Sequence, residues 1–102
     1  HKEYRRQRQM CIRDRGMSFQ RHAKRSEIWL ISKGSCEVNY SKDNPDKRNK
    51  LTLNKFDHHL ALLGEWHQIT NPFDDVCHII EIQFGEEVNE RDIERLDYYN
   101  PQ

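Results

Sequence analysis

The chain has no long run of apolar residues. Apolar side chains make up 34% of its 102 residues and charged side chains 33%. No stretch approaches the roughly 20 consecutive apolar residues that a membrane-spanning helix needs. No apolar segment follows the basic start, so we expect no membrane span and no secretory signal. About 100 residues allow one domain with a modest core.

Cysteine is also scarce. The three cysteines, Cys11, Cys36 and Cys77, include no pair separated by two residues. An odd number without that spacing argues against a disulfide framework and favours a reducing compartment, the cytoplasm. We therefore expect Cys36 and Cys77, which lie in strand-like runs, to be buried thiols.

The net charge of zero conceals an asymmetry. Residues 1–16 hold six basic and two acidic side chains, whereas residues 17–102 hold 11 basic and 15 acidic ones. The larger part is therefore mildly acidic and lacks the basic surface of a nucleic-acid-binding domain.

Residues 1–16 show no helical or strand periodicity. We expect a disordered basic tail or sequence foreign to the fold, with a basic arm for anionic partners as the alternative. The run RQMCIRDR within this segment resembles translated sequencing adapter. On that interpretation the native protein begins upstream of Met17, and its first strands are missing from this sequence.

Short strand patterns separated by turn signals occupy the rest of the chain. Residues 36–40 alternate between two faces, which is typical of a half-buried strand. Similar runs, bounded by glycine, proline or polar turns, occur at residues 28–32, 51–54, 58–63, 66–70 and 76–84. Residues 89–96 indicate a short C-terminal helix with Asn89 as its N-cap. This order predicts an all-β sandwich or barrel.

Four polar side chains could meet inside such a barrel. Gln20 and His22 are two residues apart, so on a strand they share a face. Glu27 follows across a bend, and His67 comes from a distant strand. One amide oxygen, two imidazoles and one carboxylate suit a divalent ion, zinc first, with Mn, Fe, Co or Ni as alternatives. On spacing alone, four unrelated surface residues are an equally open interpretation.

The same residues resemble the two motifs of cupins. The first motif has His-x-His, then Glu after three or four residues, and Gly six residues later. Gln20, His22, Glu27 and Gly34 keep that spacing. The second motif, Pro-x-Gly, two residues, His, three residues, Asn, is similar to residues 62–71, where leucine replaces the proline. This resemblance implies a cupin-type β-barrel, a jelly-roll-like double-stranded β-helix occupying residues 17–102 and truncated at its N-terminus.

A closer resemblance is to type II mannose-6-phosphate isomerases, whose C-terminal domain is a cupin. Residues 18–34 are similar to that family's Ser-Leu-Gln-x-His-x-x-Arg-[Ala/Ser]-Glu-x-Trp-x-x-x-x-Gly, which has glutamine in place of the first cupin histidine. Residues 64–72 resemble Gly-x-x-His-x-x-x-Asn-Pro. Residues 80–85 and 92–95 resemble Ile-Glu-Val-Gln-x-Gly and Asp-Ile-x-Arg. The Tyr-Gly-Arg ending and the usual N-terminal nucleotidyltransferase domain are missing from this sequence.

The resemblance implies an aldose–ketose isomerase acting on a sugar phosphate in mannose or polysaccharide metabolism. Arg25 and Lys24 are candidates for phosphate binding, because a guanidinium fork suits phosphate; a solvated charged turn is the alternative. Lys24 and Arg95 are candidate catalytic residues, with a salt bridge as the alternative for Arg95. The base is not identified, and Glu65 is a further candidate for it.

The implied partners are a sugar phosphate, a nucleotidyltransferase domain or neighbouring protein, and a second copy of the chain in a homodimer. Two other functions stay open: a cupin that binds a sugar or nucleotide sugar without turnover, and a degenerate cupin without metal.

The remaining residues with possible chemistry have structural interpretations. We expect Trp29 and Trp66 to pack in the core or at the barrel rim, and Asn71 to form a turn. Three histidines match no motif position and are expected to be structural or exposed: His58, His59 and His78.

Overall fold

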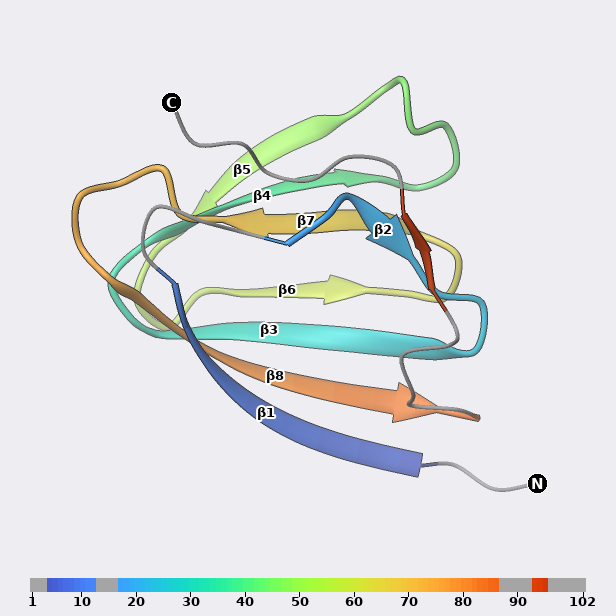
Figure 1. The fold of residues 1–102 in the computed structure, drawn as a ribbon, viewed down its shortest axis with the longest axis horizontal. Helices are drawn as coiled ribbons and strands as arrows, with labels where there is room; N and C mark the ends of the chain where they lie inside the picture. Colours follow the sequence, from blue (N-terminus) through green and yellow to red (C-terminus); the bar gives the residue numbers. More distant parts are fainter. Residues whose placement is uncertain (1–3, 13–16, 87–92, 96–102) are drawn as a thin grey trace.

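The computed structural model describes residues 4–12, 17–86 and 93–95, and these residues form two antiparallel β-sheets that face one another (Figure 1). The first sheet has the order β1 (Tyr4–Ile12), β8 (Cys77–Gly85), β3 (Arg25–Lys33) and β6 (His58–Ala61). The second has the order β5 (Asn49–Leu53), β4 (Cys36–Ser41), β7 (Trp66–Thr70), β2 (Gln20–Arg21) and β9 (Glu94–Arg95). The all-β prediction is confirmed. The described part of the chain contains no helix that could span a membrane.

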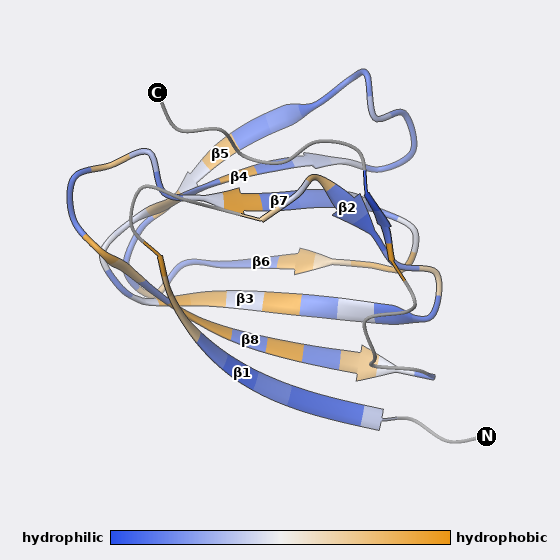
Figure 2. Cartoon of the chain, viewed as in Figure 1, coloured by the Kyte–Doolittle hydropathy of each residue, from blue (hydrophilic) through white to orange (hydrophobic). Residues whose placement is uncertain are grey.

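The core lies between the two sheets. Alternate residues of β3, β4 and β8 point inward, as the period of two in a strand requires. The cluster is built mainly from apolar side chains: Ile12, Trp29, Ile31, Cys36, Val38, Leu53, Ile69, Cys77 and Ile79. Figure 2 shows apolar segments on β3, β6 and β8, whereas β1 is hydrophilic along most of its length and apolar at its C-terminal end.

Cys36 and Cys77 form a disulfide between β4 and β8, with their Cα atoms 6.2 Å apart. Both are buried, as predicted. The prediction of separate thiols is wrong, because facing inward positions of the two sheets bring these cysteines within bridging distance. Cys11 lies outside the bridge. These cysteines therefore give no argument for a reducing compartment.

β1 contradicts the prediction of an unstructured tail over residues 4–12. It pairs with β8 from Tyr4 opposite Gly85 to Ile12 opposite Cys77. Its inward positions include Arg8, whose Nη2 lies 2.7 Å from Oε1 of buried Glu81. Because this inward position holds a charged residue, the sequence of β1 lacks the apolar alternation that would have indicated a strand. Residues 1–3 and 13–16 lie outside the described residues.

β9 contradicts the predicted C-terminal helix at residues 94–95. Glu94 and Arg95 pair with β2, opposite Arg21 and Gln20. Nη2 of Arg21 lies 3.0 Å from Oε1 of Glu94, so an ion pair between strands accompanies the β pairing. The rest of the predicted helix, including its N-cap Asn89, lies outside the described residues.

Two glycines with nearly equal φ angles allow a matched test of packing. Gly34 (φ +79°) follows β3, and a Cβ there would collide with the backbone oxygen of Val76; a Cβ at Gly64 (φ +76°) would lie in open space. Alanine at either site enters the left-handed region at about 1–2 kcal/mol. We expect Gly34→Ala to cost about 1–3 kcal/mol more, from the collision. Urea unfolding in EDTA measures both. Equal losses would contradict the close packing at Gly34.

Candidate metal centre

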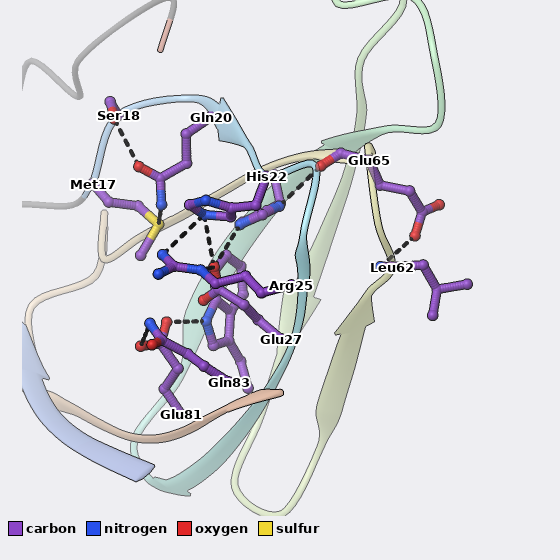
Figure 3. Close-up of polar contacts among 12 residues, drawn as sticks. Met17, Ser18, Gln20, His22, Arg25, Glu27, Leu62, Glu65, Glu81 and Gln83 are labelled. Atoms are coloured by element: carbon purple, nitrogen blue, oxygen red, sulfur yellow. Dashed lines mark hydrogen bonds and ion pairs between the residues drawn. The ribbon is translucent and has the colours of Figure 1, made fainter. Parts of the chain in front are cut away.

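Three of the four predicted ligands meet inside the barrel. His22 follows β2, Glu27 lies on β3 and His67 on β7, and all three side chains are buried. Their ligand atoms lie within 4.8 Å of one another. Figure 3 shows His22 and Glu27 pointing toward the same point between the sheets. β3, β7 and the segment after β2 therefore bring together residues that are up to 45 positions apart in the sequence.

The ring of His67 has a fixed orientation. Its Nδ1 lies 3.1 Å from the carbonyl oxygen of Glu65. A carbonyl oxygen only accepts, so Nδ1 carries the proton and donates it. Nε2 then faces Oε1 of Glu27 at 3.4 Å. Only a proton on Nε2 or a cation close to both atoms makes this buried approach favourable.

The carboxylate of Glu27 is ionised. Burial opposes its ionisation, but contacts with the His22 and His67 rings outweigh burial and hold the pKa of Glu27 below its ordinary value. Nε2 of His22 lies 2.8 Å from Oε1 of Glu27. Two imidazoles therefore converge on one buried carboxylate oxygen, which is a donor set that suits zinc and similar divalent ions.

Gln20 lies beside this cluster rather than in it. It is opposite His67 in the β2–β7 pairing, so the two side chains share a face. Its Oε1 accepts a hydrogen bond from Oγ of Ser18 at 3.0 Å, and its Nε2 donates to Sδ of Met17 at 3.5 Å (Figure 3). Its role as a ligand stays a prediction.

Arg25 is deeper than a residue at the barrel mouth would be. Its side chain is 1% exposed, and its Nη2 lies 3.1 Å from Nε2 of His22. Lys24, by contrast, is exposed in the turn before β3, and Arg95 is exposed on β9. The catalytic roles of Lys24 and Arg95 stay predictions.

Glu81 and Gln83 on β8 are interior polar residues that sequence reasoning missed. Glu81 is 0% exposed and accepts hydrogen bonds from Nε1 of Trp29 at 2.8 Å, from Nε2 of Gln83 at 2.9 Å and from Nε of Arg8 at 2.9 Å. Burial raises the pKa of Glu81 to about 7, and the neighbouring Glu27 adds to the rise.

One signal could have located Glu81 and Gln83. They continue the inward alternation begun by Cys77 and Ile79, whereas the outward position between them holds isoleucine, Ile82, 37% exposed. Hydrophobicity alone therefore assigns the two faces of this half of β8 the wrong way round. The inward start of the strand identifies them correctly.

The structural interpretations of the other residues are confirmed. Trp29 is fully buried, and Trp66 stacks on Phe19 with ring centroids 5.6 Å apart. Asn71 closes a turn: its Nδ2 donates to the backbone oxygens of Ile12 and Asp75. His58 is exposed, His59 lies near the rings of Trp29 and Tyr40, and His78 contacts Cys11. Glu65, the further candidate base, accepts a hydrogen bond from the backbone N–H of Leu62 at 2.7 Å.

Comparisons with known proteins agree on a family. A family model described as "Mannose-6-phosphate isomerase C-terminal" matches residues 1–98. The alginate biosynthesis protein AlgA of Pseudomonas aeruginosa is 33% identical over 81 residues, which cover 79% of this chain and 16% of AlgA. This chain therefore spans a small part of the length of that relative.

Solved structures share the fold. Oxalate decarboxylase from Bacillus subtilis superposes with a TM-score of 0.75 at 15% identity, over 92% of this chain and 24% of that one. QdtA, a sugar 3,4-ketoisomerase from Thermoanaerobacterium thermosaccharolyticum in complex with TDP, superposes with a TM-score of 0.63 at 18% identity, over 93% and 66%. At these identities the likeness is one of fold, and the predicted cupin-type barrel is confirmed.

The hydrogen bond from Trp29 to Glu81 can be weighed against a matched tryptophan. Nε1 of Trp66 is buried without an acceptor in the described part of the chain. Trp29→Phe and Trp66→Phe remove similar apolar area, but only the former leaves Glu81 short of a donor. We expect Trp29→Phe to lower the free energy of unfolding by about 1–3 kcal/mol more than Trp66→Phe. Urea midpoints measure this; equal losses would mean that the bond to Glu81 contributes nothing.

Proposed function

Because the chain belongs to the mannose-6-phosphate isomerase C-terminal family, we propose that it is a metal-dependent cupin that interconverts an aldose and a ketose sugar phosphate, with mannose 6-phosphate as the aldose. The observation that carries this proposal is the buried convergence of His22, Glu27 and His67.

The residues present fit a divalent ion. Nε2 of His67 is buried and makes no hydrogen bond in the described part of the chain, although it faces an ionised carboxylate. An ion between His22, Glu27 and His67 would satisfy that nitrogen, with Gln20 as a further predicted ligand. Zinc is our first choice for this donor set, and Mn, Fe, Co or Ni are the alternatives.

When bound, the ion supplies Lewis-acid polarisation of a sugar oxygen. The chain's own groups hold the proposed ligands in position and surround the charge of Glu27. The Glu65 carbonyl accepts a hydrogen bond that fixes the orientation of the His67 ring. Glu81 and Gln83, which are hydrogen-bonded to each other, lie beside Glu27. Isomerisation also needs a proton to move between two sugar carbons, and we assign catalytic roles to Lys24 and Arg95 as candidates.

The alternative is a metal-dependent domain that binds a sugar or nucleotide sugar without turnover. The exposure of both Lys24 and Arg95 favours it, since neither is buried against the cluster. The wider proposal includes a cytoplasmic location. It also includes a nucleotidyltransferase domain or a neighbouring protein as partner, because this chain spans 16% of AlgA. The homodimer stays a prediction.

Metal content tests the centre directly. We expect the purified chain to bind one divalent ion. His67→Ala should weaken binding by more than the 10–100-fold that loss of a group supporting a ligand typically costs. His58→Ala, a change at an exposed histidine on β6, is the matched control and should bind as the wild type does. Elemental analysis and calorimetry measure both. Equal metal content in all three proteins would contradict the centre.

Turnover tests the isomerase. With zinc or manganese bound, we expect fructose 6-phosphate from mannose 6-phosphate in a coupled assay, and loss of the activity in EDTA. Glu27→Gln should lower kcat/KM at least ~100-fold, because it removes the ionised ligand. His58→Ala should keep full activity. Bound metal without product would reject the isomerase, and calorimetry with mannose 6-phosphate would then test the binding alternative.

A further inference from the structure

The outer face of the first sheet is apolar, although no described strand covers it. Figure 1 shows the second sheet on one side of this sheet only. In β3 and β8 the residues that alternate with the buried ones point to the other side. The apolar residues on that outer side come from three neighbouring strands: Ile28, Leu30, Leu60, Ile80, Ile82 and Phe84. We call these six residues the outer patch.

The strand register makes the outer patch continuous. Ile28 lies opposite Ile82 on one side and opposite Leu60 on the other. Leu30 lies opposite Ile80 in the next row of the same face. Directly opposite residues of an antiparallel pair have Cβ atoms about 5 Å apart. The patch is therefore one surface that extends across β6, β3 and β8.

This surface reverses the usual arrangement of an antiparallel sheet. A sheet with one face on a core normally presents polar residues on its other face. Here Glu81 and Gln83 are buried, whereas Ile82 between them is 37% exposed and Leu60 is 43% exposed. Apolar side chains that gather on one exposed face, rather than scatter singly, mark an interaction surface.

The chemistry of the outer patch favours an apolar partner. Among the outward positions of β3 and β8 that it spans, the only residue that is not apolar is Ser26, opposite Phe84. These positions therefore hold no charge. A nucleic acid or a charged peptide would find no complementary charge within the patch, whereas a second apolar surface would bury no charge against it.

A second copy of the chain supplies such a surface, because the outer patch is complementary to itself. A two-fold axis between β3 and β8, nearly along the strands, sets Ile28 of one copy over Ile82 of the second copy. The same axis sets Phe84, the largest side chain of the patch, over the small Ser26. Two sheets pack in this way about 10 Å apart, with their strands within about 30° of each other.

The face is also large enough for a weak dimer. β3 and β8 have nine residues each, and four strands form the sheet. A spacing of about 4.8 Å between strands and a rise of about 3.4 Å per residue give the face roughly 500 Å². Two copies would bury about 1,000 Å² in total, the size at which specific interfaces begin. We therefore expect a dimer that dissociates on dilution.

We propose that the chain forms a two-fold dimer through the outer patch, with Ile28 of each copy facing Ile82 of the other. Such a contact is isologous: both copies bury the same surface, and the assembly closes at two. The inference goes beyond the proposed function, since it needs neither bound metal nor turnover.

Analytical ultracentrifugation in EDTA and in zinc tests the dimer. All proteins carry Cys11→Ser, because the exposed thiol of Cys11 could link two chains covalently. We expect the parent protein to dimerise equally in both buffers. Ile82→Glu should raise the Kd of the dimer at least about tenfold, because it places a carboxylate between apolar surfaces. Leu63→Glu, at a leucine that is 56% exposed outside the outer patch, is the matched control and should dimerise as the parent does.

Cross-linking tests the register of the two copies. Ile28→Cys mixed with Ile82→Cys, each with Cys11→Ser, should be joined by a bismaleimide that spans about 10 Å, the distance between packed sheets. Each variant alone should give less product. Thr52→Cys, exposed on β5 of the other sheet, should give none. This measurement carries the test if circular dichroism shows that Ile82→Glu is unfolded.

Two results would overturn the proposal. One is a parent protein that is monomeric at every concentration, which would leave the outer patch to another part of a longer polypeptide. The other is a dimer that folded Ile82→Glu leaves intact, which would assign the contact to a different surface, such as a sheet edge. Neither result bears on the metal centre, whose tests are metal content and turnover.

Discussion

The ionised carboxylate of Glu27, buried between two sheets, is the constraint on which the rest of the interior depends. A buried charge costs several kcal/mol unless positive or donating groups surround it. His22 from the segment after β2, His67 from β7 and Arg25 from the start of β3 converge on Glu27. The apolar core therefore occupies one end of the barrel, near Ile31 and Val38, and leaves the other end polar.

Much of the fold follows from local patterns in the sequence. The alternation in residues 36–40 and 76–84 predicted β4 and most of β8, because each has apolar residues at every second position. The spacing of Gln20, His22 and Glu27, together with His67, predicted a cluster of which the structure assembles three members. These features depend on periodicity within a strand or on a motif, and both are visible in one sequence.

The remaining features depend on partners distant in sequence. Arg8 occupies an inward position of β1 because its Nη2 pairs with Oε1 of Glu81 at 2.7 Å. No local pattern in the sequence contains that information. Cys36 and Cys77 pair across 41 positions, and pairing of cysteines does not follow from sequence alone. Gln83 faces inward although the outward positions beside it are apolar. For Arg8 and for the two cysteines, a contact between strands overrides local propensity.

The disulfide also makes the two ends of the barrel mechanically unequal. Cys36 and Cys77 tie the sheets covalently beside the apolar core. At the opposite end, where β3 begins at Arg25, hydrogen bonds and charge hold the sheets together. The free energy of local opening should therefore fall along β3 from Ile31 toward Arg25.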